Sequence, residues 1–297
     1  MELKVICCFG EILWDLFSDG KRLGGAPFNV ASSLKDLGAT VHFISRVGSD
    51  ALGDEILEEL DSKKISKEHL QRDPVHSTGK VLVSLDKNGS AQYEIEKDAA
   101  WDFIQPTPAS LELVKKSAAF VFGSLIGRGA SYQTLLDFLK VSNFSVFDLN
   151  LRPPYYSAAL LIELMKQSQL LKFNDEELYL VAQMLDSPFH SMDQHITFIA
   201  KVTGATTICV TKGRFGAVLF HEGKWFYNSG YQIKVEDTVG AGDSFLATLV
   251  YGVVHSHDLQ ATLNRACAMG ALVAASQGAN PAISESDLEQ FMCITSA

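Results

Sequence analysis

Residues 237–245, with the sequence DTVGAGDSF, place two glycines and a carboxylate at the start of a segment with helical apolar spacing. Gly240 and Gly242 bracket an alanine, so the backbone can turn tightly and aim several N–H groups at one point. The first turn of a helix adds further N–H donors and positive partial charge. Such a turn binds an anion, and Asp243 has no electrostatic reason to stand there unless it handles a proton. Stabilisation of the helix start is the alternative role of Asp243, and this segment alone leaves both open.

A second glycine pair opens a predicted helix near the N-terminus. Gly24 and Gly25 precede the sequence APFN, in which Pro27 has an early-turn position. Glycines let a ligand approach the backbone, and Asn29 offers both a donor and an acceptor for a sugar hydroxyl. Asp15, which follows the first predicted strand, adds an acceptor for vicinal hydroxyls. A simple tight turn is the alternative interpretation of the two glycines.

The composition narrows the class of ligand. The chain has 297 residues, with 25 lysines and arginines against 35 aspartates and glutamates, and a net charge of −10. A protein that coats nucleic acid or an anionic membrane needs a basic face, so a small-molecule ligand is expected instead. No window has the ~18 uncharged apolar residues of a membrane span, and the N-terminal apolar run is too short for a signal peptide. The five cysteines lack metal-type spacing, so reduced, buried thiols and a cytoplasmic location are predicted.

The elements that must position these residues alternate between strands and helices. This rhythm is typical of stacked βαβ units, and it predicts one α/β domain over residues 1–297 with a mostly parallel sheet and helices on both faces. The predicted strands are residues 4–13, 41–47, 118–122, 145–149, 170–173 and 206–211, and the predicted helices are residues 27–37, 50–60, 131–141, 157–167, 175–185 and 192–202.

Two segments break the alternation. Residues 79–97 and 216–227 each combine two β-rich runs with a short polar turn, at residues 86–89 and 221–224, which is typical of a β-hairpin. The first hairpin lies far from the later strands of the predicted sheet. It fits a flap over a ligand crevice, and it also fits a dimer edge.

Taken in order, these motifs resemble the ribokinase-like, PfkB-type family of sugar kinases, and the resemblance runs nearly end to end. The N-terminal signature is GGAPFNVA at residues 24–31, and the C-terminal signature is DTVGAGD at residues 237–243. Between them, in family order, stand RVGSD at 46–50 with Gly53, DLNLR at 148–152, NDEE at 174–177, and TKG at 211–213 with Gly216.

The resemblance implies an enzyme that transfers the γ-phosphoryl group of ATP to a sugar hydroxyl. Asp243 would take the proton of the attacking hydroxyl as the general base. The N–H groups of Gly240, Ala241, Gly242 and Asp243 would form the anion hole for the transferring group. Backbone donors add no net charge, which reconciles an acidic protein with a triphosphate ligand.

On the nucleotide side, the resemblance places Thr211, Gly213 and Gly216 in the ATP crevice, where Lys212 or Arg214 would offer charge to the phosphates or stay solvated. Asn174 and Glu177 would reach the Mg²⁺–phosphate shell through water, whereas the residues alone favour a helix N-cap with a capping-box glutamate.

The segment around Asp237 resembles the monovalent-cation loop of part of the family. Asp237 and the carbonyl of Val239 would be ligands of K⁺, together with backbone near Gly278. Ala282 replaces a hydroxyl that some members carry there, so the dependence on K⁺ is left open.

On the sugar side, the resemblance implies hydroxyl binding by Asp15, Gly24, Gly25 and Asn29. Trp101 would close over the sugar ring, with a core position as the alternative. Arg152 would meet a substrate or phosphate anion, with Asp148 or a helix end as its alternative partner. A small β lid of about residues 12–24 and 77–103 would cover the site. The short segment between Asp15 and Gly24 lacks room for further lid strands, so both a monomer and a homodimer stay open.

Within the family, Ala26-Pro27 and the sequence AAWD at 99–102 look like fructokinases, so fructose to fructose 6-phosphate is the expected reaction. A 2-keto-3-deoxygluconate kinase is the alternative, in which Arg152 would bind the carboxylate. A sugar-binding regulator without catalysis is the alternative from another class. A nicotinamide dehydrogenase is excluded, because no GxGxxG follows a predicted strand.

Overall fold

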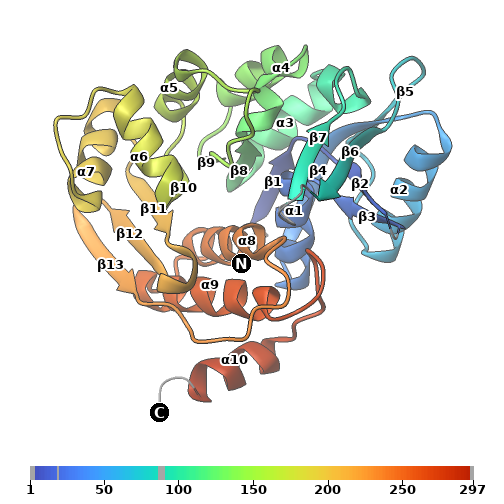
Figure 1. The fold of residues 1–297 in the computed structure, drawn as a ribbon. Coiled ribbons are helices and arrows are strands. Elements are labelled where there is room, and N and C mark those ends of the chain that lie inside the picture. Colours follow the sequence, from blue (N-terminus) through green and yellow to red (C-terminus); the bar gives the residue numbers. More distant parts are fainter. Residues whose placement is uncertain (1–3, 19, 86–90, 295–297) are drawn as a thin grey trace.

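The computed structural model describes residues 4–18, 20–85 and 91–294, and its centre is a nine-stranded sheet in the order β13-β12-β11-β10-β9-β8-β1-β4-β5 (Figure 1). From β11 to β5 all neighbours are parallel, and β12 and β13 add an antiparallel edge. The strands are β1 Val5–Phe9, β4 Thr40–Gly48, β5 Leu70–Asp73, β8 Ala119–Gly123, β9 Ser145–Asp148, β10 Leu170–Asn174, β11 Thr207–Thr211, β12 Ala217–His221 and β13 Lys224–Asn228. The predicted, mostly parallel sheet is confirmed.

Helices cover both faces of this sheet (Figure 1). One face carries α1 Ala26–Asp36, α2 Ala51–Ser62, α8 Ala241–Val254 and α9 Leu259–Ala274. The other carries α3 Pro108–Lys116, α4 Ser131–Leu139, α5 Ala158–Lys166, α6 Asp175–Met184 and α7 Met192–Thr203, and α10 Glu285–Ile294 packs on α9. Strand residues divide between the two cores with a period of two: Phe120 and Phe122 of β8 face α3–α7, and Ala119 and Val121 face α1 and α8. Burial on both sides explains why these strands are continuous apolar runs.

A second sheet of four strands, in the order β3-β2-β6-β7, forms the small lid. Its strands are β2 Leu13–Phe17, β3 Gly20–Gly24, β6 Gly79–Leu85 and β7 Ala91–Ile95. Two antiparallel hairpins, β2–β3 and β6–β7, join through a parallel pairing of β2 with β6. The strands lie within the two segments predicted for the lid, and the predicted turn at residues 86–89 lies outside the described residues.

The strand order places a crevice beside β1. The chain builds β1, β4 and β5 toward one edge and then continues with β8, β9, β10 and β11 on the other side of β1. Connections that leave the carboxyl ends of β1 and β8 therefore diverge, and ligands of open α/β sheets bind at such a switch point. The lid follows directly from β1, so it stands at this same edge.

The strand predicted over residues 4–13 is wrong at its end. β1 stops at Phe9, and Leu13 already belongs to lid strand β2. Gly10 turns the chain with φ 148°, and a Cβ there would lie 2.6 Å from Cγ of Pro27. The apolar pattern continues across the turn, so periodicity could not reveal it. The other predicted elements agree to within two residues at each end, and β5, α3, α9 and α10 were not predicted.

The cysteines follow the prediction with one exception. All five are free, and Cys7, Cys8, Cys209 and Cys267 are buried. Cys293 is exposed on α10, so its predicted burial is wrong: only one side of this last helix packs on α9. Among the helices of the described residues, none has the length and apolar character of a membrane span.

Gly25 is a position where the backbone leaves no room for a side chain. It has φ 110°, and a Cβ there would overlap the carbonyl oxygen of Glu11. Gly38 provides a matched control, because it has φ 82° but open space around it. We expect Gly25→Ala to lower the free energy of unfolding by about 3 kcal/mol or more, against about 1 kcal/mol for Gly38→Ala, in urea titrations. Equal losses in the two variants would contradict this account of the β1–α1 junction.

Candidate active site

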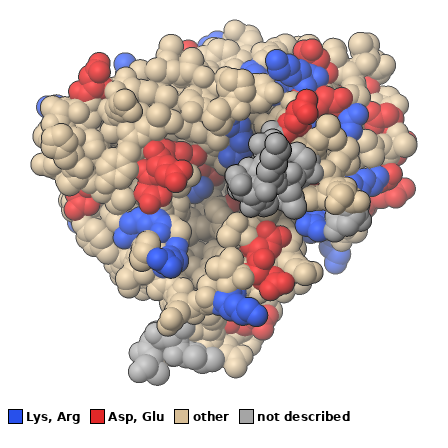
Figure 2. All heavy atoms as spheres, viewed as in Figure 1, with Lys and Arg blue, Asp and Glu red and all other residues tan. Residues whose placement is uncertain are grey.

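A cavity of about 430 Å³ lies between the sheet edge and the lid. Figure 2 shows the face seen in Figure 1 hollowed at its centre, with Lys or Arg atoms inside the hollow. The lid contributes Leu13, Asp15, Val81 and Ile95; the ends of the sheet strands contribute Glu11, Gly123, Ser124, Leu125, Asn150, Arg152 and Lys172; and the starts of α1 and α8 contribute Gly25, Ala26, Asn29, Thr238, Val239, Gly240, Gly242 and Asp243. The two glycine-bearing helix starts predicted to bind ligands therefore meet in one cavity. Gly24 does not line the cavity, but it leaves room for the Asp15 carboxylate, which a Cβ at residue 24 would overlap.

The start of α8 presents backbone donors to this cavity. Gly240 is the N-cap with φ 77°, and a Cβ there would overlap the carbonyl oxygen of Ala279. Ala241 N–H is engaged within the turn by the Thr238 carbonyl at 3.3 Å. Among the hydrogen bonds between described residues, none uses the N–H of Gly240, Gly242 or Asp243. Three of the four predicted anion-hole donors are thus available, and the fourth, Ala241, is held by the turn.

Asp243 lies beside these donors. Its Oδ2 accepts a hydrogen bond of 2.8 Å from Nδ2 of Asn29 on α1. Burial raises the pKa of the Asp243 carboxyl, while the Asn29 hydrogen bond and the charges of Lys172 and Arg152 lower it, and the net shift is upward. A carboxylate with a raised pKa is a stronger base than an exposed one, which suits proton abstraction from an alcohol.

Lys172 is a cavity residue that the sequence analysis missed. It is a lysine within the apolar strand β10, and its Nζ pairs with Oδ1 and Oδ2 of Asp148 at 3.0 and 3.2 Å. Burial lowers the pKa of Lys172, but the nearby carboxylates of Asp148, Glu177 and Asp243 raise it by more. The net shift is upward, so the ammonium stays charged. A Cβ on Gly242 would lie 3.4 Å from Nζ, so this charge stands next to the free N–H groups of α8. The signal in the sequence was a lone charge in an otherwise buried strand.

Two further carboxyl groups face the same cavity from the β1 side. Burial raises the pKa of Glu11 to about 7 and that of Asp15 to about 6, while Arg152 lowers both. Glu11 Oε1 accepts the Ala26 N–H at 3.2 Å, and its Oε2 is buried without a partner among the described residues. Glu11 was not predicted, although its signal was a lone glutamate within an apolar run of the sequence. Arg152 lines the cavity instead of pairing with Asp148, whose partner is Lys172.

A second cavity, of about 250 Å³, lies on the other side of the α8 start. Its wall includes the predicted nucleotide residues Thr211, Gly213 and Gly216, and mainly apolar side chains of the segment before α8, of α8 and of α9. Arg214 also lines it. Thr238 and Gly242 belong to both cavities, so the first turn of α8 stands at their junction. The apolar side of this junction would fit a flat, apolar ring, and the polar side would fit a charged chain.

Asn174 and Glu177 form the helix cap that was the alternative to magnesium binding. The Asn174 side chain accepts the Glu177 N–H, and Glu177 Oε2 accepts the Asn174 N–H, each at 2.8 Å, as in a capping box. Glu177 Oε1 accepts the Leu151 N–H at 2.8 Å. The buried carboxylate therefore joins α6 to the loop after β9, and neither residue lines the two cavities.

Trp101 occupies the core position given as its alternative. The side chain is 0% exposed, and a Cβ on Gly79 of lid strand β6 would lie 2.6 Å from its Nε1. The Arg128 guanidinium covers the ring at 4.1 Å and pairs with Asp102 at 2.7 Å. The ring therefore packs beneath the lid and does not line the larger cavity.

Asp237 fastens the loop predicted to hold a cation. Its Oδ1 accepts the Val239 N–H at 3.0 Å, and its Oδ2 accepts the Gly278 N–H at 3.2 Å. The structure thus brings together the three residues named for this loop, which lies directly before the α8 turn.

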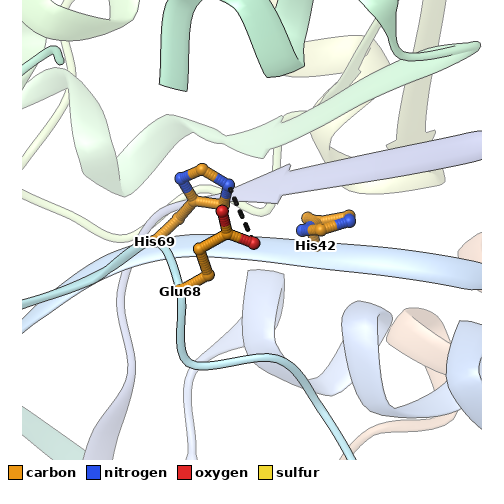
Figure 3. A group of neighbouring side chains, drawn as sticks. All are labelled: His42, Glu68 and His69. Atoms are coloured by element: carbon orange, nitrogen blue, oxygen red, sulfur yellow. Dashed lines mark ion pairs between the residues drawn. The ribbon is translucent and has the colours of Figure 1, made fainter. Parts of the chain in front are cut away.

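A separate group of potential metal ligands lies at the β4–β5 edge. Atoms of His42, Glu68 and His69 fall within 4.8 Å of one another, and Figure 3 shows the His69 ring beside the Glu68 carboxylate. His69 Nε2 and Glu68 Oε2 are 4.0 Å apart, farther than the ~3.3 Å between neighbouring donors of a tetrahedral zinc ion. None of the three lines either cavity, so this group has no part in the site.

Free N–H groups at a helix start, placed between an apolar cavity and a cavity lined by carboxyl and amide groups, suit a phosphotransferase that acts on small polar molecules. Residues 5–286 match the pfkB family carbohydrate kinases, so the chain belongs to that family and is an enzyme. A candidate sugar kinase of Pyrococcus horikoshii is 29% identical over 272 residues, covering 84% of this chain and 83% of that protein. An Escherichia coli fructokinase is 26% identical over 298 residues, covering 92% and 94%. A Vibrio cholerae fructokinase variant, solved with fructose, ADP and potassium, gives a TM-score of 0.84 at 25% identity over 98% of both chains.

The raised pKa of Glu11 gives a test of the cavity's electrostatics. With a pKa of about 7 against 4.5 for an ordinary glutamate, the folded state binds more protons than the unfolded state between these values. Stability contributed by this group is therefore lost as pH rises through that window. We expect Glu11→Gln to gain up to about 3 kcal/mol relative to the wild type between pH 5 and pH 8 in urea titrations. The exposed Glu58→Gln is the control, and a pH-independent difference for Glu11→Gln would show that Glu11 is not buried as described.

Proposed function

We propose that this carbohydrate kinase transfers the γ-phosphoryl group of ATP to fructose and forms fructose 6-phosphate. The observation that carries the proposal is the position of Asp243: its carboxylate and three free N–H groups share the first turn of α8, where the two cavities meet. The relatives named fructokinase, and the similar structure solved with fructose and ADP, support the choice of sugar.

In the proposed reaction, fructose occupies the larger cavity and the nucleotide occupies the apolar one. Asp243 takes the proton of the attacking hydroxyl as the new O–P bond forms, and the bond from the γ-phosphorus to the β-phosphate oxygen breaks to leave ADP. The N–H groups of Gly240, Gly242 and Asp243 bind the transferring group. Lys172 adds a full positive charge beside Gly242, which stabilises negative charge in this partly enclosed site.

The sugar hydroxyls would be held by the lid and by the start of α1. Asp15 and Asn29 provide side-chain hydrogen bonds, and Gly25 leaves room for close approach to the backbone. Glu11, with a pKa of about 7, can accept or donate near neutral pH. We also propose that residues 1–297 act as one domain in the cytoplasm, where five free thiols stay reduced.

We propose two cations for the reaction. Mg²⁺ accompanies ATP and neutralises phosphate charge, and Glu177 would hold its water shell with the carboxylate lone pairs that its backbone donors leave unused. Glu177 does not line either cavity, but it is near enough to Lys172, which lines the larger one, to raise the pKa of that lysine, so a contact with the ion would run through water. For K⁺, Asp237 and the Val239 carbonyl are the ligands proposed, because the loop gathers backbone from residues 239 and 278 around one carboxylate.

Removal of the Asp243 carboxylate tests the general base. We expect Asp243→Asn to lower kcat for fructose by ~10³ or more, because an amide cannot take the proton, while binding of fructose and ATP persists. The measurement is ADP release in a coupled assay, with binding followed by calorimetry. The control is Asp61→Asn, at a residue of α2 whose side chain is 62% exposed and paired with Lys67. Near-normal kcat in Asp243→Asn would exclude Asp243 as the base.

Arg152 favours 2-keto-3-deoxygluconate as the second candidate substrate, because its guanidinium lines the larger cavity and, within the described part of the chain, forms no ion pair with a carboxylate. We expect Arg152→Ala to affect fructose and a keto-acid sugar to a similar extent if fructose is the substrate. A loss at least tenfold greater for the keto acid, in kcat/KM over a sugar panel, would favour the second candidate. Absence of ATP consumption with every sugar tested would instead indicate a sugar-binding regulator.

A further inference from the structure

We propose that Asn280, in the loop between α9 and α10, is a positioning residue for the catalytic base: it fixes the orientation of the Asn29 amide, which in turn holds the Asp243 carboxylate. The inference rests on the proposed role of Asp243. It adds a residue outside the two substrate cavities, at a position that none of the sequence motifs includes.

The three side chains form one line of hydrogen bonds. Asn280 Nδ2 donates to Asn29 Oδ1 at 2.9 Å, and Asn29 Nδ2 donates to Asp243 Oδ2 at 2.8 Å. They come from three parts of the chain, the loop after α9, helix α1 and helix α8, and Asn29 is only 5% exposed. Asn29 therefore has a partner on each side and little room to move.

The direction of this line is determined by chemistry. An ionised carboxylate only accepts hydrogen bonds, so Asn29 must turn its NH₂ group toward Asp243. Its carbonyl oxygen then faces the loop and needs a donor, which the NH₂ group of Asn280 supplies. If the Asn29 amide were rotated by 180°, oxygen would face oxygen at Asp243, and NH₂ would face NH₂ at Asn280. Both ends of the line thus select the same orientation.

In this arrangement the carbonyl oxygen of the Asn280 side chain, Oδ1, is buried and left without a partner among the described residues. An unsatisfied buried carbonyl costs about 1–3 kcal/mol, so the orientation is not explained by the needs of Asn280 itself. What this orientation provides is the hydrogen bond from the Asn280 NH₂ group to Asn29 Oδ1.

The same loop is fastened to the anion-binding turn. The Gly278 N–H donates to Asp237 at 3.2 Å, and Gly240 lies so close to Ala279 that a Cβ would overlap its carbonyl oxygen. Asn280 follows directly. The loop therefore sets the place of the backbone donors and the orientation of the base together.

The electrostatic consequence concerns the charge of Asp243. The groups that act on it are Lys172 of β10, Arg152 after β9 and Asn29 of α1, all of which favour the ionised form, while burial disfavours it and the nearby Glu11 and Asp148 carboxyls couple to it. Loss of the Asn29 hydrogen bond would raise the pKa of the base. It would also release Oδ2 and let the carboxylate rotate away from the hydroxyl.

The test compares Asn280→Ala and Asn280→Asp with the wild type in single-turnover phosphoryl transfer from pH 5 to pH 9. Alanine removes the donor without adding charge, and aspartate keeps the shape but places an acceptor against Asn29 Oδ1. We expect both to slow transfer at least tenfold, to move the acid limb of the pH profile to higher pH, and to leave KM for ATP within about twofold. The control is Asn143→Asp, at an exposed asparagine that donates to the Lys115 carbonyl, which should change neither quantity.

A double-mutant cycle separates positioning from a general loss of structure. If Asn280 acts through Asn29, Asn280→Ala should have at most a twofold further effect in an Asn29→Ala background. Unchanged transfer and an unchanged acid limb in both Asn280 variants, with Asp243→Asn inactive, would overturn the positioning role alone. Full activity of Asp243→Asn would instead overturn the proposed function, whatever the Asn280 variants show.

Discussion

The first turn of α8 has N–H groups, those of Gly240, Gly242 and Asp243, without partners in the described part of the chain, and the rest of this structure depends on them. A helix start leaves N–H groups without partners inside the helix, and a protein normally satisfies them with a capping side chain or water. Here the N-cap is Gly240, which has no side chain to offer, and its left-handed conformation packs it against Ala279. The Asp237 carboxylate accepts hydrogen bonds from the N–H groups of Val239 and Gly278 and does not cap the helix. Among the described residues these donors therefore have no protein partner, and they lie at the junction of two cavities beside the switch in strand order.

The charged side chains around the first turn of α8 are arranged to suit its unpartnered N–H groups. Net negative charge would oppose a polyphosphate, and the larger cavity is lined by Glu11, Asp15 and Asp243, with Asp148 behind Lys172. Lys172 offsets them locally: it pairs with Asp148 and stands next to Gly242, while Arg152 faces the carboxyl groups on the sugar side. Burial raises the pKa of each of these carboxyls, so the cavity holds bases stronger than ordinary surface carboxylates. A proton-accepting site and an anion-binding site can therefore share one turn of helix.

The sequence predicted the sheet, most helices and the hairpin of the lid from local periodicity and turn chemistry. That the two glycine-bearing helix starts share one site followed only from the resemblance to the PfkB-type family. The sequence did not predict what depends on three-dimensional packing. The apolar run through Gly10 hid the point where β1 leaves the sheet, since a turn is set there by contact with Pro27. Lys172 belongs to an apolar strand and Glu11 to the short connection between β1 and β2, and only the fold shows that both face a cavity. Trp101 was ambiguous for the same reason: an aromatic residue after a flap fits a core or a ligand, and contact with Gly79 and Arg128 places it in the core.

The central claim is that the α8 turn binds the phosphoryl group in flight while Asp243 faces the attacking hydroxyl. A crystal structure with fructose, ADP and aluminium fluoride measures both at once. The account predicts the fluoride group about 2.7–3.1 Å from the N–H groups of Gly242 and Asp243, and an Asp243 oxygen about 2.6–3.2 Å from a fructose hydroxyl in line with it. A fluoride group bound away from this turn, or an Asp243 carboxylate directed away from the sugar, would contradict it.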